Sequence, residues 1–309
     1  MRAFVCPEYG PPEVLEPREM PTPVPTDSEV LVRIRATAVT ASDVFIRGSD
    51  IPWRFKIPMR LMIGVMRPRK AILGLVFAGE VEWAGVNVKR FRVGDKVYGL
   101  TGFGLGTYAE YMCIRETDSK HGCIARMPST IGYEAATAAA YGGLLALQHL
   151  ETAAIGPGRK VLVYGASSTS GTTAVQVAKH WGAEVTGVCG TAHVELVRSL
   201  GADHVLDYTR QDTLDPSTRF DFVLDAVGRA KTSKLKEAAK NALTPTGRYA
   251  SIDDGALKLV AARLERLNVL IEAGHVNPVI DRCFPFAELV AAHRYVGLGH
   301  KAGGVAITV

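Results

Sequence analysis

The pattern of apolar and polar residues divides the chain into three parts, and the first part is strand-like. Over residues 1–122, apolar and polar positions alternate in short runs such as 30–35 and 80–83. Alternation of this kind is typical of half-buried strands. Glycine and proline interrupt the runs, as at the Gly94-Asp95 turn. These short, interrupted strands predict a partly closed β-barrel.

The second part, 123–267, has the rhythm of strands that alternate with helices. Helix-like segments at 172–181 and 193–200 separate runs of mostly apolar residues. The predicted strands are 160–164, 184–189, 204–207, 220–224 and 247–251. Nearly continuous apolar strands indicate a parallel sheet covered on both faces, because right-handed βαβ connections place helices there.

The third part, 268–309, holds a helix-like segment at 286–296 and a strand-like segment at 305–309. Such a tail is too small to fold alone, so we expect it to return to the first domain. The predicted fold class is α/β, with a doubly wound parallel sheet and a β-barrel domain.

The turn after the strand at 160–164 is the candidate nucleotide site. A strand–turn–helix unit offers backbone N–H groups and the positive end of a helix dipole to a phosphate. Gly165 permits the tight turn, Gly171 lets the helix approach the strand, and the hydroxyls between them can donate to phosphate. The candidate residues are Gly165, Ala166, Ser167, Ser168, Thr169, Ser170 and Gly171. The spacing also fits a plain βα turn, but the strand–helix alternation that follows favours nucleotide binding.

The end of the second strand, at 189–193, has no carboxylate. An acidic residue there would hold a ribose 2′-hydroxyl and repel a 2′-phosphate, so NADPH is favoured over NADH. The candidate partners of this end of the cofactor are Gly190, Thr191, His193, Lys179 and Tyr208. Each of these side chains also fits an ordinary surface position.

Composition argues against several other classes of protein. The formal net charge of +5 falls short of the basic stripe of a nucleic-acid binder, and the basic cluster at 67–70 indicates a solvated loop. The five cysteines form no C-x-x-C pair. Without an apolar run of about 18 residues or an apolar N-terminal stretch, we expect a cytoplasmic protein with no membrane partner.

Taken together, these motifs resemble the medium-chain dehydrogenase/reductase superfamily, in its zinc-free quinone oxidoreductase (zeta-crystallin-like) branch. The resemblance covers essentially the whole chain, and its segments are 72–81, 92–97, 106–111, 141–144, 161–179, 199–208 and 303–305. It implies a GroES-like barrel, a Rossmann domain, a cleft between them and a homodimer. We therefore predict a GroES-like catalytic domain at 1–122, a Rossmann NADPH-binding domain at 123–267, and a return to the catalytic domain at 268–309.

Zinc-dependent relatives carry a histidine where this chain has Leu75, and a cysteine where it has the Ala41-Ser42-Asp43 segment. Leucine offers no lone pair to a metal, and the four-cysteine structural loop is also missing. We therefore expect no zinc and no other metal site.

Two positions depart from the related chains. Relatives usually carry Gly-Gly or Gly-Ala where this chain has Ser168-Thr169, and side chains there narrow the approach of pyrophosphate, although their hydroxyls can compensate. NADPH-preferring relatives often carry Arg or Lys at the position of Ala192.

The candidate catalytic residues are Thr40, Asp43 and Tyr141. Thr40 matches a family Asn/Thr position near the nicotinamide, and Asp43 either orients Thr40 or caps a local turn. Tyr141 follows an Ala-rich helical segment and faces either the substrate or the core. Val227 and Gly228, after the fourth strand, are expected beside the nicotinamide ribose, although Gly228 is also a plausible turn residue. The region 49–70 is expected to line the substrate entrance.

The predicted function is zinc-independent, NADPH-dependent hydride transfer to a small quinone or enone. Without a Lewis acid, reduction of an already electrophilic acceptor needs less help than oxidation of an alcohol. Two alternatives stay open: a reductase of enoyl thioesters or polyketide intermediates, and an NADPH-sensing protein with little turnover.

Overall fold

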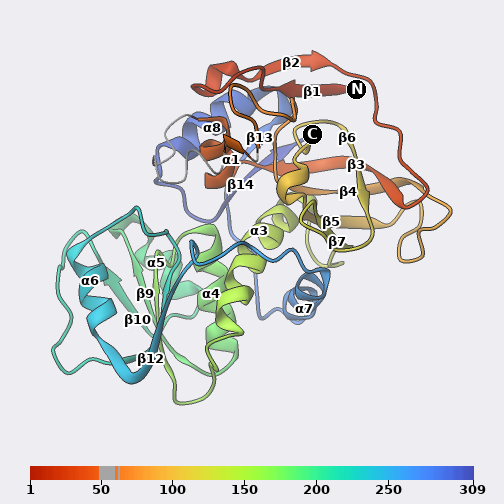
Figure 1. The fold of residues 1–309 in the computed structure, drawn as a ribbon. Coiled ribbons are helices and arrows are strands. Elements are labelled where there is room, and N and C mark those ends of the chain that lie inside the picture. The colour runs from red at the N-terminus through yellow and green to blue at the C-terminus, as the bar shows by residue number, and fades with distance from the viewer. Residues whose placement is uncertain (49–59, 62) are drawn as a thin grey trace. The chain divides into compact units, whose positions relative to one another are not determined.

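The computed structural model describes residues 1–48, 60, 61 and 63–309, which form two compact units (Figure 1). The first unit consists of Met1–Ala140, Leu259–Asn268 and Ile280–Val309, and the second of Tyr141–Lys258 and Val269–Val279. Residues 123–140, which the sequence analysis placed in the second domain, belong to the first unit. Part of the expected substrate entrance, 49–59 and 62, lies outside the described residues.

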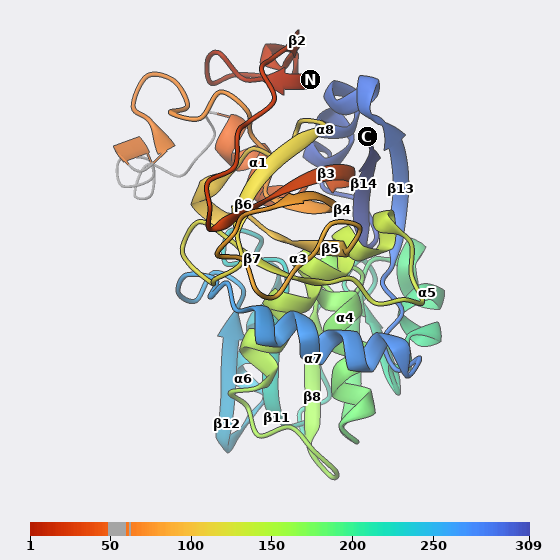
Figure 2. The same ribbon diagram turned by 90° about the vertical axis from the view of Figure 1, so that its right-hand side faces the viewer.

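The first unit is built on a seven-stranded sheet in the order β13-β14-β3-β4-β5-β7, with β6 paired to β3 (Figure 2). Its pairs are antiparallel except β13 with β14, and β1 and β2 form a separate pair. The strands are β1 (Arg2–Val5), β2 (Glu16–Glu19), β3 (Glu29–Ala38), β4 (Val76–Ala84), β5 (Lys96–Leu100), β6 (Tyr111–Arg115), β7 (Cys123–Arg126), β13 (Ile280–Pro285) and β14 (Gly304–Thr308). The tail of the chain thus joins the first unit, since β14 pairs with β3.

Strand β3 shows how the alternating pattern forms this sheet. Val30, Val32 and Ile34 are buried in the core of the first unit, and each such side chain contributes about 1.5–3 kcal/mol through its burial. Between them, Arg35 faces outward and pairs with Glu80 of β4 at 2.8 Å. The strand predicted from 30–35 is therefore confirmed.

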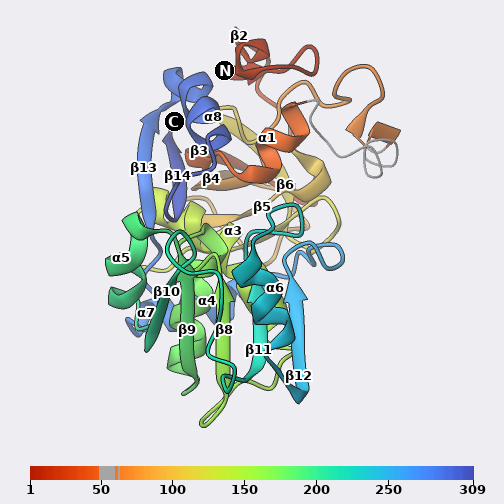
Figure 3. The ribbon, with the colours of Figure 1, turned by 90° about the vertical axis from the view of Figure 1, so that its left-hand side faces the viewer.

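The second unit contains a five-stranded parallel sheet in the order β10-β9-β8-β11-β12, and Figure 3 shows these strands side by side. The strands are β8 (Lys160–Tyr164), β9 (Glu184–Cys189), β10 (His204–Asp207), β11 (Phe220–Asp225) and β12 (Leu243–Ser251). The predicted parallel sheet is confirmed. In a sheet of this order, ligands bind outside the carboxyl ends of the strands at the point where the order reverses, here between β8 and β11.

The helices complete the two units. The α-helices are α1 (Ala41–Arg47), α3 (Tyr133–Leu150), α4 (Thr169–His180), α5 (Val194–Ser199), α6 (Lys234–Asn241), α7 (Ala261–Glu272) and α8 (Leu289–Gly297). The short 3-10 helices are η1 (Pro12–Val14), η2 (Gly102–Gly104), η3 (Thr191–His193) and η4 (Phe286–Glu288). Within the described part of the chain, no helix has the length and apolar character needed to cross a membrane.

Candidate functional site

The turn between β8 and α4 depends on two glycines. Gly165 has a φ of +82°, which side chains disfavour, and a Cβ atom there would lie 2.2 Å from Val227 Cγ1. A Cβ atom on Gly171 would lie 2.1 Å from the carbonyl oxygen of Gly165. Both predicted roles are confirmed: Gly165 makes the turn, and Gly171 allows helix α4 to approach the end of β8.

Ser168 is the N-cap of α4. Its hydroxyl oxygen accepts the Gly171 N–H at 3.0 Å, and its proton is donated to the carbonyl oxygen of Ala226 at 3.0 Å. The expectation that this hydroxyl donates to a phosphate is therefore corrected, since its proton already has an acceptor. The backbone of Ser168 is extended, with φ −70° and ψ 167°, so a side chain causes no strain where relatives carry glycine.

The other residues of the turn surround this cap. Ala166 is fully buried, and Thr169 and Ser170 are buried in the first turn of α4. The N-terminus of a 12-residue helix therefore lies directly outside the carboxyl end of β8. Such a terminus attracts phosphate through its N–H groups and its dipole.

A carboxylate lies beside the end of β9, although the second strand itself carries none. Thr191 donates its hydroxyl to Asp207 Oδ2 at 2.5 Å, and Thr209 lies 2.8 Å from the same hydroxyl. The hydrogen bond from Thr191 lowers the pKa of Asp207, which is therefore negatively charged. The sequence analysis missed Asp207 because it considered the end of one strand. The parallel register pairs Asp207 with Cys189, so aligning β9 with β10 would have found it.

Two other candidates at this end have defined partners. Lys179 places Nζ 2.5 Å from Asp203 Oδ1, so its charge is compensated within the second unit. Tyr208 is 45% exposed, and its hydroxyl lies 3.4 Å from the position of a Cβ atom on Gly190, so the structure brings these two residues together. His193 ends the short helix η3.

A buried ion pair holds the turn after β11. Asp225 ends this strand, and its Oδ2 lies 2.7 Å from Lys236 Nζ of α6, with both side chains at most 2% exposed. Lys236 also donates to the Gly228 carbonyl oxygen at 2.8 Å, and Asp225 Oδ1 accepts the Val227 N–H at 3.2 Å. The pair therefore positions both residues that were expected beside the nicotinamide ribose. Sequence reasoning missed Lys236, since a lysine on a short polar helix usually lies in solvent.

In the first unit, Thr40 and Asp43 form a reciprocal capping box at the start of α1. Asp43 Oδ2 accepts the Thr40 N–H at 2.8 Å and the Thr40 hydroxyl at 2.6 Å, and the Asp43 N–H donates back to Thr40 Oγ1 at 3.2 Å. Asp43 therefore does both things that were considered for it, because it caps the turn and orients Thr40.

The Asp43 carboxyl group is 1% exposed, and burial raises its pKa to about 6 against the opposing effect of its hydrogen bonds from Thr40 and the neighbouring Tyr108 hydroxyl. Its second oxygen, Oδ1, receives no hydrogen bond of good geometry from the described residues. Removal from water thus outweighs the donors, as expected for a carboxyl group with one oxygen unsatisfied.

A chain of buried polar groups continues behind Asp43. Arg47 Nε lies 3.2 Å from His293 Nδ1, and His293 Nε2 lies 3.0 Å from the Tyr108 hydroxyl. A guanidinium group can only donate, so Nδ1 accepts and Nε2 carries the proton that is donated to Tyr108. Burial and then Arg47 lower the pKa of His293 to about 3, so the imidazole stays neutral. Burial raises the pKa of Tyr108 well above its usual value.

Tyr141 lies inside α3 and not after the helical segment, which corrects its predicted position. It is partly exposed and belongs to the second unit, whereas Thr40 and Asp43 belong to the first. Leu75 is buried directly before β4. Among the described residues, no three His, Cys, Asp or Glu side chains are grouped so that they could hold a metal ion.

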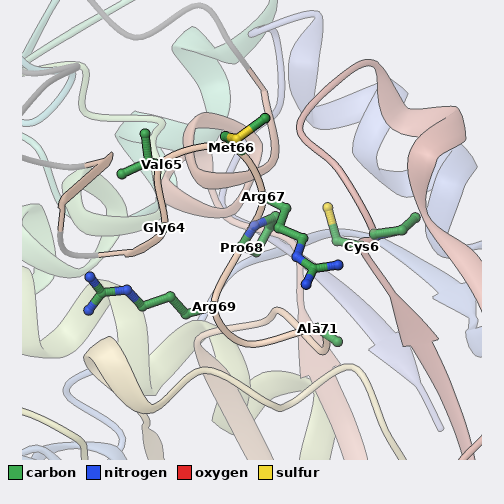
Figure 4. Close-up of a pocket in the computed structure, with 9 residues that line it drawn as sticks. Cys6, Gly64, Val65, Met66, Arg67, Pro68, Arg69 and Ala71 are labelled. Carbon is green, nitrogen blue, oxygen red and sulfur yellow. The ribbon is translucent and has the colours of Figure 1, made fainter.

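A separate cavity of about 570 Å³ lies in the first unit (Figure 4). Its lining residues are Cys6, Pro7, Gly64, Val65, Met66, Arg67, Pro68, Arg69 and Ala71. Burial raises the pKa of the Cys6 thiol to about 11, so it is not a ready nucleophile. The cavity shares no lining residue with the capping box or the nucleotide turn.

Comparison with known proteins covers the whole chain. A model described as an alcohol dehydrogenase GroES-like domain matches residues 26–121, and models described as zinc-binding dehydrogenase match 171–264 and 256–307. The 2-methylene-furan-3-one reductase of Solanum lycopersicum is 31% identical over 327 residues, with 99% of this chain and 79% of the relative covered. The chain belongs to the medium-chain dehydrogenase/reductase superfamily, in its quinone oxidoreductase-like branch.

Two further members of this superfamily are similar over their length. The chloroplastic NADPH-dependent alkenal/one oxidoreductase of Arabidopsis thaliana is 31% identical, with 99% of this chain and 79% of the relative covered. The solved quinone oxidoreductase of Coxiella burnetii has a TM-score of 0.82 at 26% identity and is covered to 99%, with 100% of this chain. The predicted GroES-like and Rossmann-type domains are therefore confirmed.

Proposed function

We propose that this chain is a zinc-independent, NADPH-dependent reductase that transfers a hydride to a quinone or an α,β-unsaturated carbonyl. The observation that carries the proposal is the β8–α4 turn, where Gly171 leaves no room for a Cβ atom beside the N-terminus of a helix. Such a turn suits a pyrophosphate that must approach the backbone closely. The tomato and Arabidopsis relatives are named for reduction of an exocyclic enone and of alkenals and enones.

The dinucleotide, when bound, supplies the hydride. The N-terminus of α4 would hold its pyrophosphate, and Val227 and Gly228, fixed by the Asp225–Lys236 pair, would support the nicotinamide ribose. Tyr208 and Gly190 would flank the adenosine end. NADPH remains our proposal over NADH, but the carboxylate of Asp207 limits this preference because it would repel a 2′-phosphate.

In the first unit, the Thr40 hydroxyl would donate a hydrogen bond to the oxygen that becomes negative during reduction. Thr40 occupies the family position near the nicotinamide. With leucine at position 75, the chemistry relies on this donor and on an acceptor that is already electrophilic.

The test begins with fluorescence titrations of NADPH and NADH, followed by NADPH consumption with small quinones, enones and an enoyl thioester. We expect tighter NADPH binding and turnover with quinones or enones. Turnover with the thioester alone would favour the alternative reductase, and binding without any turnover would favour a sensor. Stoichiometric zinc in the purified protein would contradict the metal-free proposal. A homodimer, which the family resemblance implies, is tested by sedimentation equilibrium, and cytoplasmic location stays a prediction.

A further inference from the structure

The capping box of α1 has more chemical content than a helix start requires. Asp43 is almost fully buried, its Oδ1 lacks a well-formed hydrogen bond among the described residues, and its Oδ2 lies 2.6 Å from the Thr40 hydroxyl. We propose that Asp43 stores the proton that Thr40 delivers to the reduced substrate. This inference rests on the proposed function, and it assigns the proton donor of that reaction.

The geometry makes Thr40 a switch whose direction depends on Asp43. While Asp43 is a carboxylate, the single proton of the Thr40 hydroxyl is donated to Oδ2. When Asp43 carries a proton on Oδ2, the 2.6 Å hydrogen bond reverses, because Thr40 Oγ1 can accept a second bond beside the one from the Asp43 N–H. The proton of Thr40 is then available to another acceptor.

Every charged or titratable group that faces this pair favours a stored proton or leaves it undisturbed. On its own helix, Arg47 is occupied by His293 Nδ1 and by the carbonyl oxygen of Gly10. From α8, His293 faces the site in its neutral form. Tyr108 faces Asp43 directly and keeps its proton, and Cys6 near Tyr108 also stays neutral because burial raises its pKa. No cation therefore pairs directly with Asp43, whose pKa lies near 6.

The transfer balances as follows. Addition of one hydride to the β-carbon of an enone leaves an enolate, which lacks one proton. The Thr40 O–H bond breaks as its proton passes to the enolate oxygen, and Thr40 Oγ1 takes the proton of Asp43 Oδ2. The products are the enol, which tautomerises to the saturated ketone, and an Asp43 carboxylate, which regains a proton from water. Tyr108 and His293 exchange no proton in this scheme and act as positioning residues.

The experiment measures kcat for a small enone across pH 5–8.5, at saturating NADPH and with correction for acid decay of the cofactor. Since the protonated carboxyl group is the donor, wild-type kcat should fall roughly tenfold per pH unit above the pKa of Asp43. In Asp43→Asn, kcat should be low and independent of pH in this range, with KM changed less than about twofold. Thr40→Ser should keep the wild-type profile, and Thr40→Val should lose it.

Asp95→Asn is the matched control. Asp95 also accepts a backbone N–H from the residue three positions earlier, Arg92, at 2.9 Å, but it lies on a surface turn. This variant should keep the wild-type pH profile. A profile that survives in Asp43→Asn would overturn the relay while the reductase function stands. A wild-type protein that reduces none of the acceptors would overturn the proposed function, and the relay with it.

Infrared titration of the cofactor-free protein gives a readout independent of turnover. Wild type should show a protonated carboxyl band that disappears as pH rises through about 6, and Asp43→Asn should lack it. Tyr108 and His293 should give no change over this range. If no band is lost in Asp43→Asn, Asp43 holds no proton and the proposal fails.

Discussion

At the scale of single residues, Asp207 is the side chain that most directly limits cofactor choice. Replacing it by asparagine keeps an acceptor for the Thr191 hydroxyl and removes the negative charge. We predict that Asp207→Asn binds NADPH several-fold more tightly, since a screened charge near the surface is worth about 1 kcal/mol, and that NADH binding changes less. Fluorescence titration at fixed ionic strength measures both affinities.

Asp215→Asn is the control for that prediction, because Asp215 is an exposed carboxylate that holds only Ser217 of its own turn. Its NADPH affinity should equal that of wild type. A selective loss of NADH affinity in Asp207→Asn would show instead that Asp207 holds the ribose 2′-hydroxyl, and the NADPH proposal would then be wrong.

Residue roles set by backbone geometry could be predicted from the sequence, whereas roles set by distant partners could not. Gly165 and Gly171 were recognised because a tight turn and a close approach demand glycine at those two points. Ser168 and Lys179 were taken as phosphate donors, but their partners, Ala226 and Asp203, lie 58 and 24 residues away. No local pattern announces such pairs.

At the scale of elements, the buried Lys236 joins α6 to the end of β11. Lys236→Met should destabilise the second unit by about 3–5 kcal/mol, because it leaves the Asp225 carboxylate buried without its cation. The double variant Asp225→Asn/Lys236→Met should regain a large part of that loss. Urea unfolding followed by circular dichroism measures both. Additive losses in the double variant would mean that Lys236 stabilises mainly through the carbonyl oxygens of Gly228 and Lys231.

The N-cap of α4 permits a second test at this scale. Ser168→Ala removes the acceptor for the Gly171 N–H and the bond to Ala226, so we expect a loss of about 1–2 kcal/mol together with weaker NADPH binding. Ser168→Thr keeps a capping hydroxyl and should stay close to wild type in both. Unchanged stability in Ser168→Ala would show that the cap contributes little here.

Strands of the second unit were predicted more accurately than the helices. The structure gives β8, β9 and β10 the predicted bounds, because buried parallel strands are continuous apolar runs between polar turns. Helices α6 and α7 were not predicted, and the boundary of the units was placed before α3. The start of α1 did carry a signal, since Thr40-x-x-Asp43 has the spacing of a capping box. Its burial against Tyr108 and His293 could not be predicted, because α8 lies about 250 residues further along the chain.

At the scale of the whole molecule, Asp43 and His293 act in opposite directions on stability as pH changes. Burial raises the pKa of Asp43 to about 6, so the folded protein binds this proton more tightly, and the resulting stability is present near pH 4 and lost as pH rises through 6. Burial lowers the pKa of His293 to about 3, so the unfolded chain binds that proton, and stability is lost as pH falls from 6.5 towards 3. Each effect reaches roughly 3–5 kcal/mol, and between about pH 4 and 6 they oppose one another.

Single variants should therefore separate two effects that cancel in wild type. Asp43→Asn leaves only the histidine, so its stability relative to wild type should decline as pH is lowered from 6.5 to 4.5. His293→Gln keeps an acceptor for Arg47 and a donor for Tyr108 but leaves only the aspartate, so its relative stability should rise over the same interval. Urea midpoints at half-unit steps of pH measure both curves, and other titrating groups are common to all three proteins. Parallel curves would mean that neither group is protonated as its burial requires, whereas curves that diverge in these directions would establish that the buried chain from Arg47 to Asp43 holds a neutral imidazole beside a carboxyl group able to store a proton.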